Sequence, residues 1–214
     1  LFKKASFVFN EDYSIYSDTS AYFITWNATP STFRYQEIQN DLTNPIPKDN
    51  YFIREITTSF KEVTIKRSFG YGHSQKLPDF DEGQGYGTDY FVERAWDLML
   101  ENVYKNDIDA NINVAITGYG EDASAHKAAF YLNNNLLKTD PFSGYKVRKN
   151  AITIAAADLS SQMNLKIKAE GNIEDKLSVS VIKYSYPSEF KFNQSKYAQI
   201  KIPSSIIRKY LEIE

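Results

Sequence analysis

Apolar and polar side chains alternate one by one along several short stretches of this sequence, and this period of two constrains the fold more than any other feature. Leu165, Ile167 and Ala169 alternate with charged residues, and Val63 and Ile65 follow the same pattern. Successive side chains of a β-strand point to opposite faces, so the alternation predicts strands with one face on a core and the other in water. Alternation or a short apolar run predicts further strands at 6–9, 22–26, 51–60, 112–116, 128–132, 151–156, 179–181 and 200–202. In the strand at 179–181, the alternation predicts that Val179 and Val181 share one face.

About a dozen short strands in one chain favour a β-sandwich, because each of the two sheets then covers the apolar face of the other. The 16 tyrosines and 14 phenylalanines among 214 residues fit this interpretation, since aromatic residues are enriched in strands. A chain of this length buries enough apolar surface to fold without covalent cross-links. The sequence therefore predicts an all-β fold.

One segment matches two periods. Trp96, Met99, Leu100 and Val103 fall at helical spacing, whereas Trp96, Leu98 and Leu100 alternate as they would in a strand. Periodicity does not separate the two alternatives in so short a segment. The strands predicted on either side favour a strand here as well.

Proline and glycine mark the breaks between these elements. Pro45 and Pro47 predict a turn or short linker. We expect residues 1–45 to hold N-terminal strands, which form a small β subdomain or join the sandwich, and residues 46–214 to form the sandwich itself. Residues 68–88 contain five of the nine glycines and predict a long surface loop, and residues 118–125 predict a second loop.

Charge and composition exclude several classes of function. The formal net charge is −2, and acidic and basic residues are interspersed without a basic stripe, so we expect no nucleic-acid partner. No apolar run approaches the roughly 18 residues that a membrane-spanning helix needs. The chain has no cysteine, which excludes thiolate nucleophiles and thiolate metal sites.

The two histidines, His73 and His126, are the imidazoles from which a catalytic base could be drawn. Both lie in glycine-rich or alanine-rich surroundings, and we expect them to be exposed loop residues. No G-x-S-x-G segment is present to supply a serine nucleophile. Glycosidase chemistry needs two carboxylates flanking a sugar, and the spacing of the acidic residues selects no such pair. We therefore predict that this chain has no catalytic residues and is not an enzyme.

The acidic stretch 79–89 is a candidate calcium loop. Calcium takes six to eight oxygen ligands from carboxylates and carbonyls on a flexible backbone, and Asp79, Asp81, Glu82 and Asp89 could supply some of them. The spacing differs from that of an EF-hand, and the alternative is a solvated acidic loop. Apart from calcium, we expect no cofactor.

Aromatic side chains near this stretch could bind sugars. Tyr71, Tyr86, Tyr90 and Trp96 are the candidates, because an aromatic face matches the apolar face of a pyranose ring. The alternative is that these residues pack within the core or within the loops. If the sugar-binding hypothesis holds, the partner would be a polysaccharide.

Three stretches, 15–26, 60–91 and 178–192, carry a family resemblance. The first reads IYSDTSAYFITW, the second runs through the glycine-rich segment to Asp89-Tyr90-Phe91, and the third is an aliphatic strand that ends in Tyr186-Pro187. This combination resembles the region that precedes the catalytic domain in gingipain-like cysteine peptidases, especially the PorU-type sortases of the bacterial type IX secretion system.

The resemblance implies a jelly-roll, galactose-binding-like sandwich with an Asn-Asn turn at 133–135. It also implies a secreted or cell-surface protein associated with the bacterial outer membrane, with a peptidase domain beyond Glu214 as its partner in the same chain. No catalytic residue of the family has a counterpart here. We expect a non-catalytic accessory sandwich, and the alternative is a carbohydrate-binding module with a calcium-stabilised loop.

Overall fold

A computed structural model describes residue 10 and residues 47–65, 68–69, 75–76, 83–105, 107–120, 125–192 and 200–202. The strands predicted at 6–9 and 22–26 lie outside these residues. The strands are β1 Phe52–Ser59, β2 Val63–Ile65, β3 Ser68–Phe69, β4 Gln75–Lys76, β5 Gly85–Gly87, β6 Glu93–Met99, β7 Ala110–Gly118, β8 Ala125–Leu132, β9 Asn135–Ser143, β10 Arg148–Ile154, β11 Gln162–Ala169 and β12 Leu177–Ser188. One 3-10 turn, Ala156–Asp158, follows β10.

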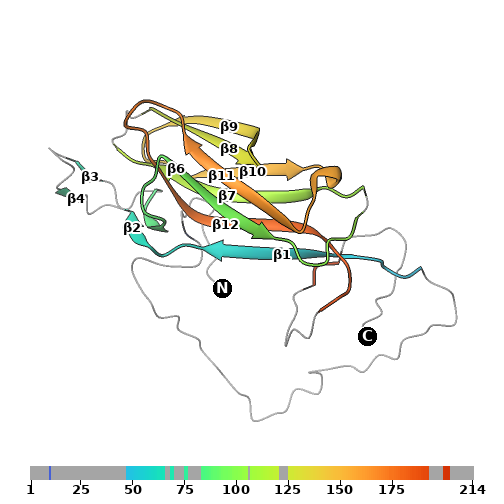
Figure 1. The fold of residues 1–214 in the computed structure, drawn as a ribbon. Coiled ribbons are helices and arrows are strands. Elements are labelled where there is room, and N and C mark those ends of the chain that lie inside the picture. Colours follow the sequence, from blue (N-terminus) through green and yellow to red (C-terminus); the bar gives the residue numbers. More distant parts are fainter. Residues whose placement is uncertain are drawn as a thin grey trace, which may run out of the picture.

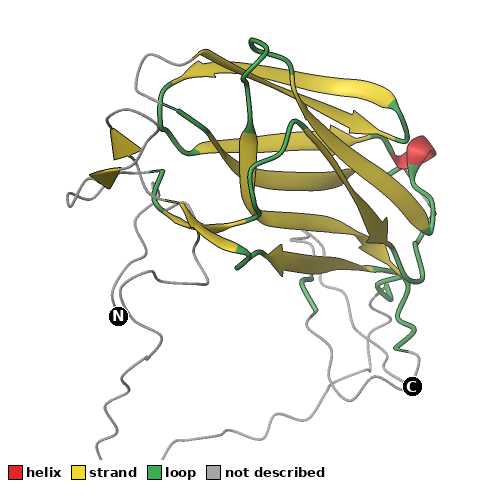
Figure 2. Cartoon of the chain, turned by 60° about the vertical axis from the view of Figure 1, so that its left-hand side comes forward, coloured by secondary structure: helices red, strands yellow, loops and turns green. Residues whose placement is uncertain are grey.

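The longer strands form two antiparallel sheets that face each other (Figures 1 and 2). Their orders are β1-β12-β7-β10 and β6-β11-β8-β9. The last two described strands, β11 and β12, are inserted between earlier strands, and of the connections between these eight strands only β8–β9 stays within one sheet. This strand order is that of a jelly roll with two Greek keys. The predicted all-β jelly-roll sandwich is therefore confirmed.

The core lies between the two sheets and is built by the predicted alternation. Ile112 and Ile116 on β7 and Leu165 and Ile167 on β11 are fully buried, while the residues between them on β11 are partly exposed. The ambiguous segment is the strand β6, in which Leu98 faces the core opposite Met163. The strand interpretation of this segment is confirmed.

The prediction that Val179 and Val181 share one face is wrong. A β-bulge places Val179 opposite Ile116 but Val181 opposite Ala115, so that Ser180 is the extra residue of the pair. A bulge inserts one residue and reverses the faces that follow it. Val179 is consequently buried in the core, whereas Val181 is only half-buried and Ile182 takes the next core position.

A second correction concerns residues 68–88, because the end of this predicted surface loop is buried. β5 pairs with β2, and Gly83, Gln84 and Thr88 are buried. Thr88 exchanges backbone and side-chain hydrogen bonds with Val179, including Thr88 N–H to Val179 O at 2.8 Å. The end of this segment therefore pairs with the edge of β12 beyond the end of β1 and is not a free loop.

Polar side chains join the two sheets along the β9–β10 side. Arg148 on β10 donates two hydrogen bonds to the Asp140 carboxylate on β9, at 3.0 and 2.6 Å. Asn150 donates a third, from Nδ2 to Asp140 Oδ2, at 3.0 Å. Burial raises the pKa of Asp140, but the hydrogen bonds from Arg148 and Asn150 outweigh it and hold the pKa below its ordinary value. This side of the sandwich is closed by charge-assisted bonds.

Asn10 connects the N-terminal region to the sandwich. Its buried side chain donates through Nδ2 to the carbonyls of Phe60 and Tyr86, at 3.0 and 2.9 Å. The Ser180 carbonyl lies 3.5 Å from the same nitrogen. One side-chain amide thus bridges the ends of β1, β5 and the β12 bulge.

The Asn-Asn turn between β8 and β9 is confirmed, and it yields a test. Asn133 and Asn134 have φ values of 48° and 69°, as a two-residue turn of type I′ requires.

We expect Asn134→Val to destabilise the fold by about 1–2 kcal/mol, because a β-branched residue is strained in this conformation. Asn134→Gly should be close to neutral. Chemical denaturation measures both, and equal stabilities of the two variants would contradict the expectation.

Candidate functional site

His126 and Asp175 form a buried pair at the end of the sandwich where β8 begins and β12 approaches. His126 Nδ1 and Asp175 Oδ1 are 2.7 Å apart, and the two side chains are 2% and 0% exposed. The second carboxylate oxygen accepts from the backbone N–H groups of Gly171 and Lys127, at 2.7 and 3.1 Å. The pair therefore fixes the loop between β11 and β12 to the start of β8.

The far side of the His126 ring is closed by backbone and by an aromatic ring. A Cβ atom on Gly118 would lie 2.4 Å from both Cδ2 and Nε2 of His126, and the Phe142 ring centroid lies 4.9 Å from that of the imidazole. Within the described part of the chain, Nε2 is buried without a hydrogen-bond partner. Among the described residues, Gly118, Phe142 and Asp175 thus enclose the imidazole.

The expectation that both histidines are exposed loop residues is wrong for His126. It lies in β8 and is 4% exposed, because β8 begins before the predicted strand at 128–132. Extending the alternation Leu132, Phe130, Ala128 by one step reaches His126 and would have placed it inside. His73 lies outside the described residues.

The pair gives a testable pH dependence. Burial raises the pKa of Asp175, but the hydrogen bonds from His126, Lys127 and Gly171 outweigh it, so the pKa is lowered from its ordinary value. A lowered folded-state pKa stabilises the fold above the ordinary carboxyl pKa of about 3.9, and this stabilisation is lost as the pH falls through the folded-state value. We expect the stability difference between the wild type and Asp175→Asn to be largest near about pH 7 and to shrink toward about pH 3. Urea unfolding at both pH values measures it, and a difference that grows toward low pH would contradict it.

The candidate calcium ligands fall mostly outside the described residues. Asp79, Asp81 and Glu82 are not described, and Asp89 is exposed. Asp89 Oδ1 accepts from the Tyr90 N–H at 2.8 Å, and the Asp89 N–H donates to Glu62 Oε2 at 3.1 Å. Among the residues that the structure describes, no group of three or more metal-ligating side chains occurs. The calcium loop remains a prediction.

The candidate sugar-stacking residues do not form a row. Trp96 packs against Phe60 and Phe91, each with ring centroids 5.7 Å apart. Tyr90 meets the Tyr119 ring edge-on at 4.7 Å, and burial raises its pKa.

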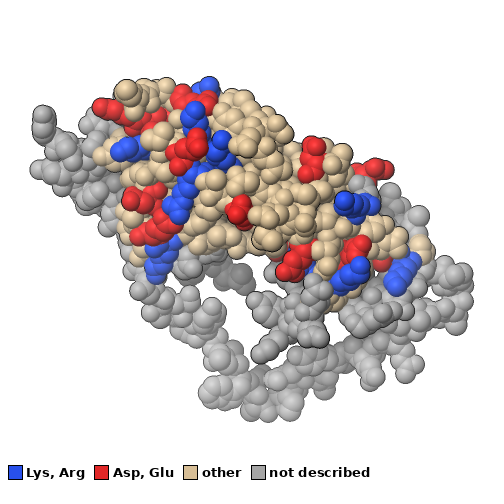
Figure 3. Space-filling model, in the orientation of Figure 1, with Lys and Arg blue, Asp and Glu red and all other residues tan. Residues whose placement is uncertain are grey.

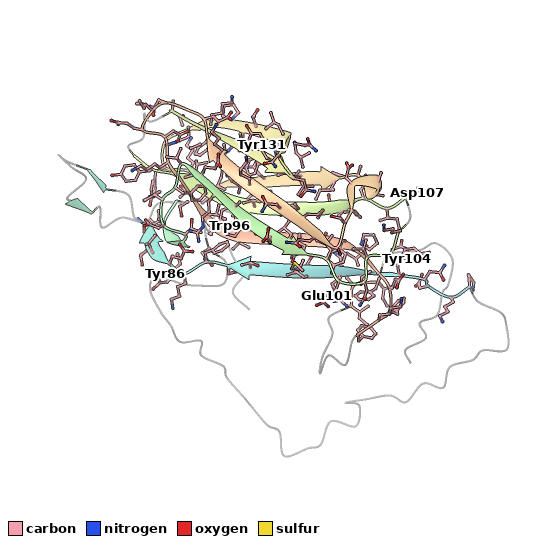
Figure 4. The ribbon with its side chains drawn as sticks, viewed as in Figure 1. Tyr86, Trp96, Glu101, Tyr104, Asp107 and Tyr131 are labelled. Atoms are coloured by element: carbon pink, nitrogen blue, oxygen red, sulfur yellow. The ribbon has the colours of Figure 1, made fainter. Side chains whose placement is uncertain are left out.

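Tyr86 lies apart from Trp96, as Figure 4 shows, with the Lys61 ammonium 4.9 Å from its ring centroid. Tyr71 lies outside the described residues. The role of these aromatic residues in sugar binding therefore remains a prediction.

A half-buried aromatic residue that the sequence reasoning did not select lies on the outer face of the second sheet. Tyr131 on β8 is opposite Lys166 on β11, and its hydroxyl donates to Glu170 Oε1 at 2.8 Å. The Lys166 ammonium is 5.1 Å from the ring centroid, and Lys127 lies 3.3 Å from Glu170. Figure 4 shows Tyr131 on β8, far from Tyr86. The sequence feature that could have singled out Tyr131 is an aromatic residue at a polar position of an alternating strand.

The hydrogen bond between Tyr131 and Glu170 dominates the electrostatics of this surface. It raises the pKa of Tyr131, with burial and the charges of Glu170 and Glu93 adding to the effect. The same bond lowers the pKa of Glu170, with help from Lys127 and Lys168. The tyrosine is therefore held as a neutral hydroxyl that donates to a carboxylate.

Within the described residues, no helix is long and apolar enough to cross a membrane. A sequence search finds no matching family model and no matching curated protein.

Comparison with solved structures supports the jelly-roll class. The chain is similar to dimeric latent PorU from Porphyromonas gingivalis, with 12% identity and a TM-score of 0.51, over 70% of this chain and 14% of that one. The chain thus spans about a seventh of the length of that structure.

Two carbohydrate-binding modules show a weaker likeness. One is CBM36 in complex with calcium and xylotriose, with 12% identity and a TM-score of 0.33, over 43% of this chain and 71% of the module. The other is a family 35 module from Clostridium thermocellum, with 13% identity and a TM-score of 0.30, over 64% of this chain and 98% of the module.

Proposed function

We propose that this chain is a non-catalytic accessory β-sandwich of a larger exported protein, packed against a gingipain-like peptidase domain in the same polypeptide. The observation that carries the proposal is the likeness to latent PorU, in which this fold makes up only a small part of a much longer chain. The fold alone is shared at this level of identity. The accessory role, the export by a type IX route and the surface location are the parts that we propose.

The chemistry of the described residues supports a structural role. The imidazole of His126 is enclosed by Gly118 and Phe142 and bonded to Asp175. The Asp140–Arg148 pair joins two sheets. These polar groups bond to one another within the sandwich, as groups that stabilise a fold do.

We also propose the division of the chain at residue 45, with the jelly roll in residues 46–214. The described strands of the sandwich lie within 52–188. Asn10 supports a close association of the N-terminal region with the sandwich, because its side chain is buried against the ends of three strands. On this view the N-terminal strands join the sandwich.

The parent gene gives the first test. The proposal expects the coding sequence after Glu214 to continue into a domain with the Cys and His residues of a peptidase. A stop codon directly after Glu214, or a continuation without such a domain, would contradict it.

A second experiment tests the packing itself. The peptidase region and the 214-residue chain would be produced separately and mixed in an analytical ultracentrifuge. Contacts between domains of one chain commonly bury about 600–1,500 Å², so we expect a complex at high micromolar concentrations. Independent sedimentation at all concentrations would exclude a packed arrangement.

The alternative function, a carbohydrate-binding module with a calcium-stabilised loop at Asp79, Asp81, Glu82 and Asp89, has its own test. Calcium that binds only the folded state raises the unfolding temperature, and the stabilisation grows with the logarithm of the calcium concentration relative to the dissociation constant. A thermal scan with calcium and with a chelator would show an upward shift with calcium if the loop binds it. Identical unfolding temperatures in both conditions would contradict the hypothesis that this loop binds calcium.

A further inference from the structure

β6 is an edge strand, and the hydrogen bonds at its two ends show which of its backbone groups face outward. It pairs with β11 on one side and is the last strand of its sheet on the other. The Val92 carbonyl and the Leu100 N–H bond to β11 or to the residue before it, at 2.7 and 2.8 Å. Successive residues of a strand direct their backbone groups to opposite sides. The groups that point away from β11 are therefore those of Glu93, Ala95, Asp97 and Met99.

The far end of this outward edge is closed by side chains from the opposite sheet. The Tyr184 hydroxyl donates to the Met99 carbonyl at 3.2 Å. The Tyr186 hydroxyl accepts from the Glu101 N–H at 2.9 Å and donates to the Glu101 carbonyl at 3.2 Å. The edge beyond Asp97 therefore needs no further strand to satisfy it.

No such partner reaches the three residues before this point. Within the described part of the chain, the outward backbone groups of Glu93, Ala95 and Asp97 have no hydrogen-bond partner. All three residues are exposed. A row of unpaired N–H and C=O groups on an edge strand is a template to which another strand can add. We refer to residues 93–97 as the open edge of β6.

The other edges of the two sheets are closed by different means. β9 and β10 are joined by the pair of Asp140 and Arg148, and β9 contains Pro141, which offers no N–H to a neighbour. β1 is paired at Ile53 with Lys201. The open edge of β6 has neither a proline nor a covering segment among the described residues, and what distinguishes it is its acidic side chains.

Two carboxylates on this edge have no cationic partner in the described chain. Glu93 forms no ion pair there, and Asp97 accepts from the neutral amide of Asn164 at 2.8 Å. The arginines on this side of the sandwich are already paired, Arg94 with Glu62 and Arg54 with Glu101, at 2.7 and 2.8 Å. The edge therefore offers two negative charges and no unpaired arginine.

Lysines also lie near β6, but on its other side. Lys168 and Lys166 are opposite Glu93 and Ala95 on β11. An added strand would lie about 4.8 Å from β6 and about twice that distance from β11, so its side chains would meet the carboxylates first. Acidic and basic groups are interspersed over the side of the molecule that Figure 3 shows. The position of each charge relative to the edge thus matters more than the total charge.

From this arrangement we propose that the open edge of β6 binds an extended cationic segment of a partner polypeptide as an additional antiparallel strand, with lysine or arginine side chains opposite Glu93 and Asp97. In such strand addition the main chain supplies the affinity and alternate side chains supply the specificity. Met99, 54% exposed at the end of the edge, gives the added strand an apolar contact as well.

The same carboxylates disfavour a second copy of this chain as the occupant. Antiparallel pairing of two open edges about Ala95 would place each Glu93 opposite an Asp97, and like charges directly opposite each other destabilise a strand pair. A neutral segment would leave both carboxylates without a charged partner. The inference goes beyond the accessory role and does not depend on it.

The first experiment compares two peptides of opposite charge. The probe is acetyl-Gly-Lys-Val-Thr-Val-Lys-Gly-amide, whose two lysines and threonine share one face, and the matched peptide has Glu in place of both lysines. Each is titrated into the full 214-residue chain, isotopically labelled for NMR. We expect the amide signals of Glu93, Ala95 and Asp97 to shift and these amides to become protected from hydrogen exchange. The acidic peptide should bind about tenfold or more weakly. Equal affinities, or no binding of the lysine peptide, would overturn the proposal.

An N-methylated peptide tests whether a strand is added. Methylation of the threonine nitrogen keeps both lysines and removes the N–H that would donate to the Ala95 carbonyl. We expect the affinity to fall by about tenfold. An unchanged affinity would show that only the charges attract the peptide, which contradicts strand addition. Shifts at residues 93–97 that depend on protein concentration without peptide would make a second copy the occupant and would contradict it too.

Variants of the chain identify the edge. Ala95→Pro removes an N–H that points away from β11, a position at which an edge strand accepts proline, and it should weaken binding by about tenfold. Glu93→Gln should weaken it by about threefold. The matched control is Asp158→Asn, in the 3-10 turn, which should bind as the wild type does. An Asp158→Asn variant that binds as weakly as Glu93→Gln would show a general charge effect and would refute the assigned edge.

Thermal unfolding of each variant keeps the test interpretable. If Ala95→Pro unfolds, the N-methylated peptide still measures the same pair of backbone groups from the partner's side, with the wild-type chain. If Ala95→Pro folds and binds the lysine peptide as the wild type does, the outward N–H of Ala95 is not used and the proposal is wrong.

Discussion

Replacing Asp175 by alanine is expected to lower the free energy of unfolding by about 3–5 kcal/mol, because the groups that bond to its buried carboxylate would all be left without that partner. His126 would lose its partner at 2.7 Å. The N–H groups of Gly171 and Lys127 would lose their acceptor as well. Urea denaturation of the wild type and the variant at neutral pH measures the difference.

Two further variants define what Asp175 contributes. Asp175→Asn retains an acceptor of similar size, so its loss should be clearly smaller than that of the alanine variant. Asp158→Ala, in the exposed 3-10 turn, removes an acidic side chain without a buried partner and should change stability by less than about 0.5 kcal/mol. An Asp175→Ala variant as stable as Asp158→Ala would show that the buried pair does not hold the fold.

The Gly118→Ala substitution is expected to destabilise the fold by about 2–3 kcal/mol through steric overlap. Its new Cβ would lie 2.4 Å from two atoms of the His126 ring. That ring cannot swing aside, since Asp175 holds one edge and Phe142 lies against it. Gly118 is not among the glycines with positive φ, so backbone strain does not contribute. Chemical denaturation gives the magnitude.

A double-mutant cycle isolates the contact. In a His126→Ala background the ring is absent, and Gly118→Ala should then cost little. We expect the two substitutions together to be less damaging than the sum of their separate effects by about 2 kcal/mol. Additive effects would mean that Gly118 is required for a reason other than the closeness of the imidazole.

Alternation predicted the strands of the sandwich because each strand has one face on the core and the other in water. The buried residues of β11 follow the predicted alternation, as do Ile112 and Ile116 of β7. The segment that matched two periods forms the strand β6. The jelly-roll order came from the family resemblance and not from periodicity, because strand pairing depends on contacts between distant segments. Periodicity therefore predicts where the strands are, whereas the family resemblance predicts their order in the two sheets.

The features that escaped prediction have a common physical origin in contacts between distant positions. The Ser180 bulge follows no local composition rule, and it moved Val181 off the core face. His126 and Asp175 are separated by 49 positions, so no spacing motif joins them. Residues 83–88 look like a glycine-rich loop locally, but β2 and β12 bury them. The bond from Tyr131 to Glu170 likewise joins residues 39 positions apart.

The positions of β11 and β12 have a consequence for folding during synthesis. Each fills the gap between two strands that leave the ribosome earlier: β12 between β1 and β7, and β11 between β6 and β8. Until the codons for Leu177–Ser188 have been read, β1 has no neighbour within its sheet. Pairing of such distant segments is slow. Both sheets of the sandwich can therefore close only after β12 has been synthesised, whatever follows it in the chain.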